Sequence, residues 1–256
     1  MGKIYNLIQT LGNEIGYLEK ASNMELDSKT ANAGKNNFTK YWRDLGANGY
    51  QGQPWCLCFV VWCFVHTFGA SEAKKLLNMP QYVYYTPTSA QYFKNMKRWH
   101  KYPRVGDVIF FKNSQRICHT GIVYMIDQSK VYTVEGNTNC GSTLEANGGA
   151  VAKKSYPLNY ARIAGYGRPD YKDYSMPPVV PSSDIKKGKK GYQAAFLQQC
   201  LNYLGANLTE DGEFGPLSEK ALIDFQSRYK LLPDGEYGPK TRAVMCKQVY
   251  ERAVNA

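Results

Sequence analysis

The sequence predicts an α+β protein, with helices and antiparallel strands in one large domain followed by a small helical domain. A single apolar helix is expected in residues 51–69, QGQPWCLCFVVWCFVHTFG, because Pro54 suits a first turn and Gly69 an end. Strand patterns follow in GDVIFF, HTGIVYM and VYTVEGNTN, which are short apolar runs of strand length. After a proline- and lysine-rich stretch, three further segments have the spacing of helices.

The amino-terminal segment MGKIYNLIQTLGNEIGYLEK is expected to be helical, because Ile4, Ile8, Leu11 and Ile15 recur at helical spacing. It has no unbroken apolar run of the kind that an export signal needs. No segment of the chain approaches the length of a membrane span. We therefore expect a protein that is made in a host cytoplasm without a signal peptide and does not insert into membranes.

The cysteines are expected to be mostly reduced, because the seven of them form an odd set without an export signal. Cys56 and Cys58 are too close together for ordinary zinc-knuckle spacing. No second pair of cysteine or histidine ligands completes a structural zinc site.

The net charge of +11 is unevenly distributed. Residues 1–171 hold 20 basic and 11 acidic side chains, residues 172–190 hold 5 and 2, and residues 191–256 hold 7 and 8. Such a surface fits nucleic acid, an anionic polymer such as a bacterial wall, or simply a soluble basic protein. No recognised nucleic-acid motif accompanies the charge, so we expect no nucleic-acid partner.

The chain is expected to divide at RPDYKDYSMPPVVPSSDIKKGKKG, which has four prolines and almost no apolar periodicity. This places a first domain at 1–171, a linker at 172–190 and a second domain at 191–256. In the second domain, a helix is expected in YQAAFLQQCLNYLG, and the turns DGEFGP and DGEYGP each precede another helix. Three short helices joined by Asp-Gly turns predict a compact bundle.

The second domain resembles the peptidoglycan-binding module that accompanies many cell-wall hydrolases. That module's pattern appears here as FLQQCL, DGEFGPLS, ALIDFQ and DGEYGPKT. The first copy departs from it mildly, with Ser218 where threonine is usual. The resemblance implies that bacterial peptidoglycan is the binding partner.

The three cysteines of the apolar helix are unequal candidates for a nucleophile. A cysteine at a helix amino terminus lies at the positive end of the macrodipole, which favours the reactive thiolate. Cys56 is nearest that end and Cys58 is a serious rival, although their side chains point to opposite sides of a helix. Cys63 lies two turns further on, where the dipole has little effect. All three also suit plain packing, since free cysteine behaves as a small apolar group.

A cysteine nucleophile needs a base, and the chain has three histidines. His66 lies ten residues along the same helix from Cys56, which is about 15 Å by helical rise, so it cannot reach. His100 is possible because it stands just before a turn. His119 opens a strand pattern that turns back at about residues 126–130.

The expected hairpin brings polar groups towards His119. A turn at about residues 126–130 places His119 opposite Asn137 or its neighbour, and Glu135 shares a face with Asn137. One or both can then hydrogen-bond the imidazole and fix its tautomer. The stretch EGNTN is also ordinary turn chemistry.

Residues 1 to about 170 resemble the CHAP family, the cysteine, histidine-dependent amidohydrolases and peptidases. Its motifs appear here as WCLCFVVW, GDVIFF with HTGIV, and VEGNT. The resemblance implies a papain-like layout, with amino-terminal helices packed on an antiparallel sheet. It also implies Cys56 as nucleophile, His119 as base, and Glu135 and Asn137 as orienting groups. By loose papain analogy, Gln53 is a second oxyanion donor beside the Cys56 backbone N–H.

Some members of this family hold calcium just before the nucleophile, on an aspartate-rich loop. The matching stretch here, RDLGANGYQGQ, offers one acid, Asp44, together with Asn48. Calcium sites usually have more than one carboxylate. We therefore expect no metal and no cofactor.

Together, the two resemblances imply a peptidoglycan hydrolase that cleaves an amide bond. It would be an N-acetylmuramoyl-L-alanine amidase or an endopeptidase. We expect a monomeric, phage endolysin-like enzyme that acts on the wall after release from the host. The alternatives are a bacterial autolysin or exported antibacterial toxin of the same chemistry and, from another class, a non-catalytic wall-binding protein.

Overall fold

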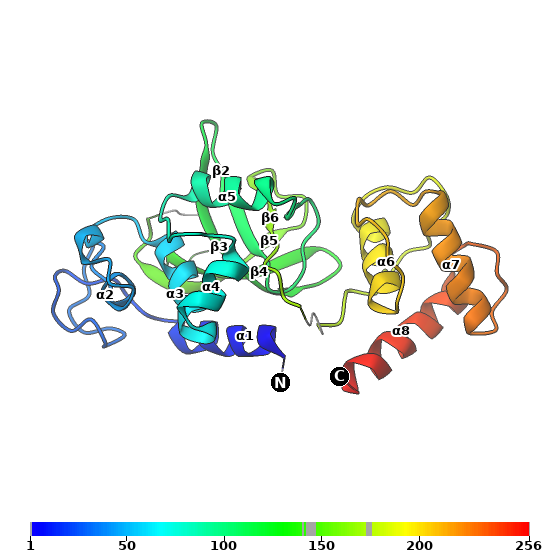
Figure 1. Cartoon of the computed structure of the whole chain (residues 1–256), viewed down its shortest axis with the longest axis horizontal. Coiled ribbons are helices and arrows are strands. Elements are labelled where there is room, and N and C mark those ends of the chain that lie inside the picture. The colour runs from blue at the N-terminus through cyan, green and yellow to red at the C-terminus, as the bar shows by residue number, and fades with distance from the viewer. Residues whose placement is uncertain (1, 140, 142–146, 173–175, 256) are drawn as a thin grey trace. The chain divides into compact units, whose positions relative to one another are not determined.

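The computed structural model describes residues 2–139, 141, 147–172 and 176–255 (Figure 1). The chain divides into two compact units, one of residues 1–126 and 130–174, the other of residues 127–129 and 175–256. The first unit is α+β with an antiparallel sheet, and the second is helical. The predicted fold class is therefore confirmed.

The first unit is built on a six-stranded sheet in the order β1-β6-β2-β3-β4-β5, in which every pair is antiparallel. The strands β3 and β4 lie inside the sheet, so both edges of each are paired with neighbouring strands. The strand bounds are β1 (Trp99–His100), β2 (Val108–Lys112), β3 (Ile117–Ile126), β4 (Lys130–Thr138), β5 (Ala150–Pro157) and β6 (Ile163–Gly167).

Helix α3 (Cys56–Phe68) is apolar on all sides and packs on β3 and β4. All of its first nine residues are buried, which explains why the helix lacks a clean polar face. Helices α1 and α4 pack on α3 in turn, and α5 packs on β3 (Figure 1). The helix bounds are α1 (Lys3–Glu14), α2 (Lys40–Asp44), α3, α4 (Ala70–Leu77) and α5 (Thr86–Asn95), with a 3₁₀ turn η1 (Asn48–Tyr50).

Gly136 of β4 lets α3 approach the sheet closely. A Cβ atom at this position would lie 2.5 Å from Cβ of Phe59 and 2.8 Å from Cζ3 of Trp55. Any larger residue would therefore push the helix away from the strand. The glycine of the EGN motif and the aromatic residues around Cys56 thus form one packing contact.

The register of the central hairpin agrees with the sequence-based prediction. Ile122 pairs with Val134 and Ile126 with Val131, and only residues 127–129 separate the two strands. Continuing this register towards the start of β3 brings His119 level with the end of β4. The turn length therefore determines which β4 residues lie near His119.

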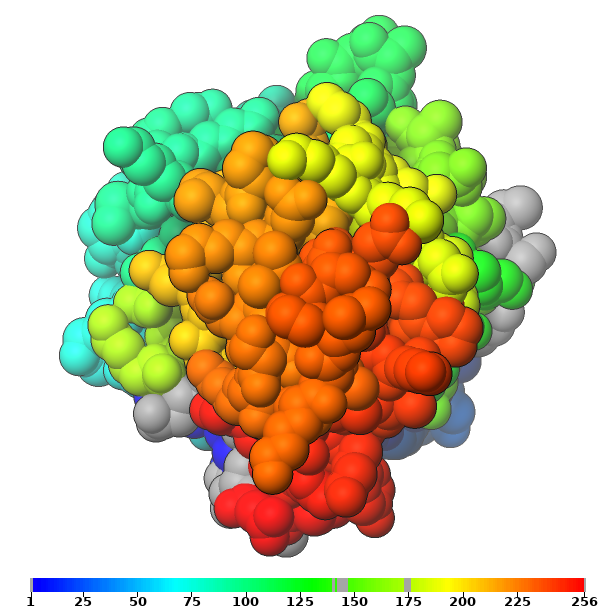
Figure 2. Space-filling model, turned by 90° about the vertical axis from the view of Figure 1, so that its right-hand side faces the viewer, coloured from blue at the N-terminus to red at the C-terminus, as the bar shows by residue number. Residues whose placement is uncertain are grey.

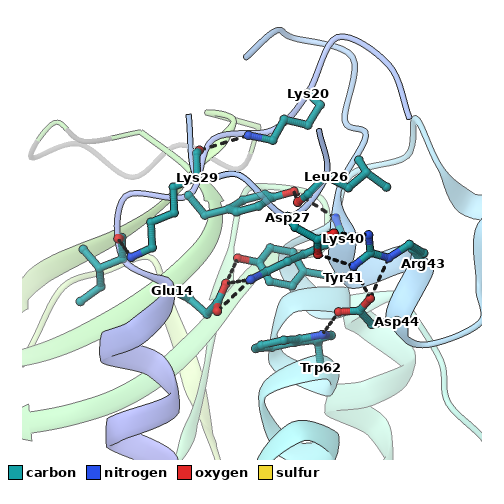
Figure 3. A network of polar contacts seen from close by, with 12 residues as sticks. Glu14, Lys20, Leu26, Asp27, Lys29, Lys40, Tyr41, Arg43, Asp44 and Trp62 are labelled. Atoms are coloured by element: carbon teal, nitrogen blue, oxygen red, sulfur yellow. Dashed lines mark hydrogen bonds and ion pairs between the residues drawn. The ribbon is translucent and has the colours of Figure 1, made fainter. Parts of the chain in front are cut away.

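A partly buried polar network joins α1, α2 and α3 (Figure 3). Glu14 accepts hydrogen bonds from the Tyr41 hydroxyl at 2.7 Å and from Lys40 Nζ at 3.0 Å. Asp44 accepts one from Trp62 Nε1 at 2.9 Å and pairs with Arg43 at 2.8 Å. Because these groups satisfy one another, the loop before α3 is held against the helix.

The second unit consists of helices α6 (Tyr192–Tyr203), α7 (Pro216–Arg228) and α8 (Pro239–Val254). In Figure 2 the face turned to the viewer is largely formed by α7, in orange, and α8, in red. Apolar side chains from all three helices meet in one core, including Leu197, Leu222 and Met245. The predicted three-helix bundle is thus the architecture of this unit.

The two DGExGP turns of the second unit are held by the same hydrogen bonds. Each glycine has a left-handed φ, +70° at Gly212 and +71° at Gly235, which favours glycine. The Gly212 N–H donates to Gln198 Oε1, and the Gly235 N–H donates to Gln226 Oε1, both at 2.9 Å. The internal repeat in the sequence is therefore a repeat of one buried glutamine-and-turn unit.

Each glutamine also donates to three acceptors. Gln226 Nε2 bonds Asp234, the Glu236 carbonyl and Thr241 Oγ1, the last at 3.2 Å. Gln198 Nε2 makes the equivalent bond to Ser218 Oγ at 3.1 Å. The serine that departs from the module's pattern therefore keeps the hydrogen bond, because only the hydroxyl is used.

Part of the segment predicted as a linker packs into the second unit. Ile185 is fully buried in that core, and it exchanges backbone hydrogen bonds of 3.1 and 2.9 Å with Tyr237. The Tyr237 hydroxyl donates to the Pro181 carbonyl at 3.1 Å. The linker was predicted because the segment lacks an apolar periodicity. A single buried isoleucine in an extended segment produces no such periodicity, so the packing could not be seen in the sequence. Residues 173–175, at the start of the predicted linker, lie outside the described residues.

Replacing Gln226 with methionine is expected to destabilise α7 and α8 locally by about 2 kcal/mol, because the buried Gly235 N–H would lose its acceptor. Hydrogen exchange of peptides from these helices measures the change. Gln248→Met is the matched control, since the side chain of Gln248 bonds only the nearby Glu251 among the residues that the structure describes. Equal protection in both variants would show that the glutamine does not hold the turn.

Candidate active site

Cys56 is the first residue of α3, where the backbone N–H groups have no partners within the helix. Cys56 is 6% exposed, and it lines a pocket of about 510 Å³ on the surface of the first unit. Partial exposure at a helix amino terminus favours a reactive thiolate. The position therefore combines access for a substrate with stabilisation of negative charge.

Cys58 and Cys63 have the opposite environment. Both are fully buried, and burial raises the pKa of each thiol well above its usual range. A buried cysteine kept in the thiol form behaves as an apolar packing group. The structure therefore separates the two leading candidates, since Cys56 faces the pocket and Cys58 faces the core.

His119 lies in β3 and is completely buried. Its Nε2 atom is 2.9 Å from Oε2 of Glu135, and this leaves Nδ1 for Cys56. Nδ1 makes no protein hydrogen bond of normal geometry, but the imidazole interacts with the Cys56 side chain. The three groups thus form a chain from Cys56 to His119 to Glu135, the order found in nucleophile–base–orienter sites.

The pKa of His119 is set by opposing effects. Burial lowers it, but hydrogen bonding and charge interactions with Cys56 and Glu135 outweigh burial and raise the pKa to about 10. The imidazole is therefore protonated at neutral pH, which places a positive charge beside the Cys56 side chain.

Glu135 accepts hydrogen bonds from three directions. The Thr133 hydroxyl donates at 2.6 Å, the Tyr156 hydroxyl at 3.2 Å, and His119 Nε2 lies at 2.9 Å. All three partners are donors, so an ionised carboxylate fits the position best. Gly121 makes room for it, because a Cβ atom there would lie 2.5 Å from Glu135 Cγ.

No hydrogen bond joins Asn137 to His119 in the described part of the structure. Its Oδ1 atom accepts from the Gly149 N–H at 3.3 Å, and its Nδ2 atom donates to Asn147 at 3.0 Å. Its φ of +55° lies in the left-handed region, and the pairing of β4 with β5 shifts register between Glu135 and Thr138. This irregularity breaks the alternation that the sequence-based argument assumed.

Asn137 is nevertheless linked to the nucleophile through Gly149 and Glu19. The Gly149 carbonyl accepts from the Glu19 N–H at 2.8 Å, and a Glu19 oxygen accepts from Trp55 Nε1 at 2.9 Å. Trp55 immediately precedes Cys56. Glu19 was not predicted from the sequence, where it stands in GYLEK, just after the amino-terminal helical pattern.

Gln53 and a set of aromatic side chains line the same pocket as Cys56. The loop that carries Gln53 is held by Gln51, whose side chain bonds both the N–H and the carbonyl of Thr39 at 2.9 Å. Trp42 stacks on Tyr50 with ring centroids 5.4 Å apart. The aromatic residues of the wall are Trp42, Tyr50, Tyr82, Tyr84 and Tyr85.

The other two histidines stand elsewhere. His66 stacks on Trp62 within α3, with ring centroids 4.5 Å apart. His100 lies in β1, paired with Tyr166 of β6. Neither lines the pocket that contains Cys56.

The described residues contain no group of three or more histidine, cysteine, aspartate or glutamate side chains placed to hold a metal. The carboxylate of Asp44, the acid of the calcium-like stretch, is bonded to Trp62 and Arg43. In the same part of the chain, no helix is both long and apolar enough to cross a membrane.

Two family models match the chain. Residues 47–137 match the CHAP domain, and residues 190–245 match a peptidoglycan binding domain. The chain therefore contains a CHAP domain and, carboxyl-terminal to it, a peptidoglycan-binding domain, as its motifs predicted. The two domains together support a peptidoglycan hydrolase.

Solved structures give weaker likenesses. The SleB N-terminal domain is 32% identical with a TM-score of 0.27, over 28% of this chain and 99% of that chain. A peptidoglycan-binding protein from Clostridioides difficile, solved with glutamine hydroxamate, is 22% identical with a TM-score of 0.26, over 46% and 72%. No curated protein matches the chain.

The titration of His119 tests the geometry of the site. We expect it to titrate far above 6.5 in the wild-type protein and at a lower pH in Glu135→Gln, because Glu135 is one cause of the raised pKa. Because the pKa is raised on folding, protonated His119 stabilises the folded protein. This contribution to the free energy of unfolding is complete below pH 6.5 and is lost as the pH rises towards 10. The measurement is an NMR titration of the imidazole ring. A midpoint near 6.5 in both proteins would contradict the arrangement.

Proposed function

We propose that the protein hydrolyses an amide bond of bacterial peptidoglycan with Cys56 as nucleophile, His119 as base and Glu135 as orienting group. The observation that carries the proposal is the Cys56–His119–Glu135 chain beside a pocket, in a protein that also has a peptidoglycan-binding domain. Asn137 has a supporting part, through the loop that joins it to Glu19 and Trp55.

The chemistry proposed is acyl transfer in two steps. His119 holds the proton of the Cys56 thiol, and Sγ attacks the amide carbonyl carbon. The C–N bond then breaks, and the amine leaves with the proton from His119. In the second step, water attacks the thioester and gives a proton to His119, and this proton returns to Sγ as the C–S bond breaks. The products are a carboxylic acid and an amine.

The negative charge on the carbonyl oxygen needs donors at the amino end of α3. The backbone N–H of Cys56 has no partner within the helix, so it is available as one donor. Gln53 lines the same pocket from the preceding loop, and we propose its side-chain amide as the second.

Two bonds fit this chemistry, and both are amides. An N-acetylmuramoyl-L-alanine amidase separates sugar from peptide, whereas an endopeptidase cuts within the stem or bridge. Purified peptidoglycan should yield soluble products, and their masses distinguish the two activities. No soluble products, with binding of the protein to the wall intact, would favour a non-catalytic wall-binding protein instead.

The biological role stays a prediction. A phage endolysin that acts after release, a bacterial autolysin and an exported toxin would all use this site. We propose the endolysin role because catalytic and wall-binding domains share one chain. Lysis of intact cells from outside and after expression inside a host, with and without a pore-forming partner, would test it.

A further inference from the structure

Arg116 is the only charged residue among the described residues that line the pocket beside Cys56. The rest of the wall is aromatic, polar and uncharged, as at Gln53, or aliphatic, as at Val83. Arg116 lies at the edge of this aromatic cleft. No described carboxylate forms an ion pair with it. An unpaired guanidinium in such a cleft attracts an anionic group of a ligand.

The backbone that carries Arg116 is fixed by its own turn. Asn113 Oδ1 accepts from the N–H groups of Gln115 at 2.9 Å and Arg116 at 2.8 Å. The Asn113 N–H donates back to the Arg116 carbonyl at 3.0 Å. Three hydrogen bonds within four residues make this a defined turn, so the backbone position from which the Arg116 side chain extends is fixed.

The side chain of Arg116 is held as well. Its guanidinium carbon lies 5.4 Å from the centre of the Tyr85 ring, and Nη1 donates to the Ile117 carbonyl at 3.3 Å. That carbonyl also accepts from the Thr86 hydroxyl at 3.2 Å, which ties the two sides of the pocket together. Among the described residues, one of the five guanidinium donors is used in this way, which leaves the other four for a ligand.

We infer that Arg116 binds a carboxylate of the peptide part of the substrate while the scissile amide lies at Cys56. This inference rests on the proposed function, because it assigns the substrate's charge at the same site. The aromatic wall would pack against the apolar parts of the substrate, and Arg116 would select for a free acid over an amide. Arginine suits this role because its planar fork matches a carboxylate.

A neighbouring hollow of about 340 Å³ provides the control. It is also lined by Arg116, and by Lys112 and Lys94, but the two lysines do not line the pocket of Cys56. Lys112→Gln therefore removes the same charge from the same region without touching the pocket. General attraction of an anionic substrate to the basic surface would be weakened equally by both changes.

The experiment compares two soluble muropeptides, one with free peptide carboxylates and the other with the same carboxylates converted to carboxamides. In the wild-type protein, kcat/KM should be about tenfold higher for the free acid, as expected for a partly exposed charge-assisted pair. This preference should disappear in Arg116→Gln and persist in Lys112→Gln. Arg116→Lys should retain part of it, since the charge remains but the fork is lost.

Two results would overturn the inference. Equal kcat/KM values for the two substrates in the wild-type protein would show that no carboxylate is selected. Equal loss of preference in Arg116→Gln and Lys112→Gln would show that the basic surface attracts the anionic substrate in general and that Arg116 is not a specific carboxylate-binding site. In both cases the proposed function stands, because the muropeptides are still cleaved. If the wild-type protein cleaves neither these substrates nor purified walls, the proposed function itself fails and the inference falls with it.

Discussion

Replacing Cys56 with alanine is expected to lower hydrolysis of purified walls by at least about 10⁴-fold, as loss of a nucleophile does in related mechanisms. Cys56 lines the pocket and interacts with His119. Cys56→Ser should be nearly as damaging, because a hydroxyl is far less acidic than a thiol and would lack the stable thiolate form. The release of soluble fragments from walls measures the effect.

Cys58→Ala is the matched control for this change, because it alters a cysteine two residues away in the same helix. Cys58 is fully buried in the core, and its thiol pKa is raised well above the usual range. We expect most of the activity to remain, with a modest loss of stability from the small cavity. An inactive, folded Cys58→Ala protein beside an active Cys56→Ala protein would reverse the assignment.

The second large effect is expected at His119 and Glu135. His119→Ala should be about as damaging as Cys56→Ala, since nucleophile and base act as a unit. Glu135→Gln should lower kcat/KM by roughly 10²- to 10⁴-fold, by analogy with the acid of a serine triad. The amide group of the new glutamine would place its own N–H donors opposite the hydroxyl donors of Thr133 and Tyr156, or it would leave His119 without a charged partner.

Asn137→Gly is the comparison for Glu135→Gln. Glycine keeps the left-handed backbone at this position and removes only the side chain. We expect a loss below about tenfold, because Asn137 acts through a loop and not on the imidazole itself. His100→Gln should have little effect, since His100 lies in β1. A stronger loss in Asn137→Gly than in Glu135→Gln, or an essential His100, would refute this division of roles.

The sequence predicts the ends of α3 and the register of the central hairpin well, because both depend on local signals. Pro54 and Gly69 delimit the helix, and a three-residue turn fixes the strand pairing. These local signals place Cys56 at the start of α3 and His119 in β3, but the two residues meet because α3 packs on β3 and β4. Their assignment as partners still needed the family motifs, because helix position alone left Cys58 as a rival.

The roles of Glu135 and Asn137 could not be separated from the sequence. Regular alternation places both on one face, but β4 loses its regular pairing with β5 after Glu135 and Asn137 takes a left-handed φ. Asparagine after glycine is a weak signal of such a turn, because asparagine tolerates this region. The contact of Glu19 with Trp55 was harder still to predict from the sequence. The two residues are 36 positions apart, and Glu19 lies in an irregular segment.

The measurement that tests the central claim most directly is the mass of the enzyme during turnover. A soluble muropeptide reaction is quenched with acid, and the protein is digested and mapped by mass spectrometry. We predict an acyl group on the peptide that contains Cys56, attached as a thioester and absent from His119→Ala. Its mass also identifies the bond, because the acyl group left by an amidase is the sugar acid without amino acids, whereas the acyl group left by an endopeptidase contains amino-acid residues. Turnover with no adduct on Cys56, or with an adduct on Cys58 or Cys118, would contradict the account.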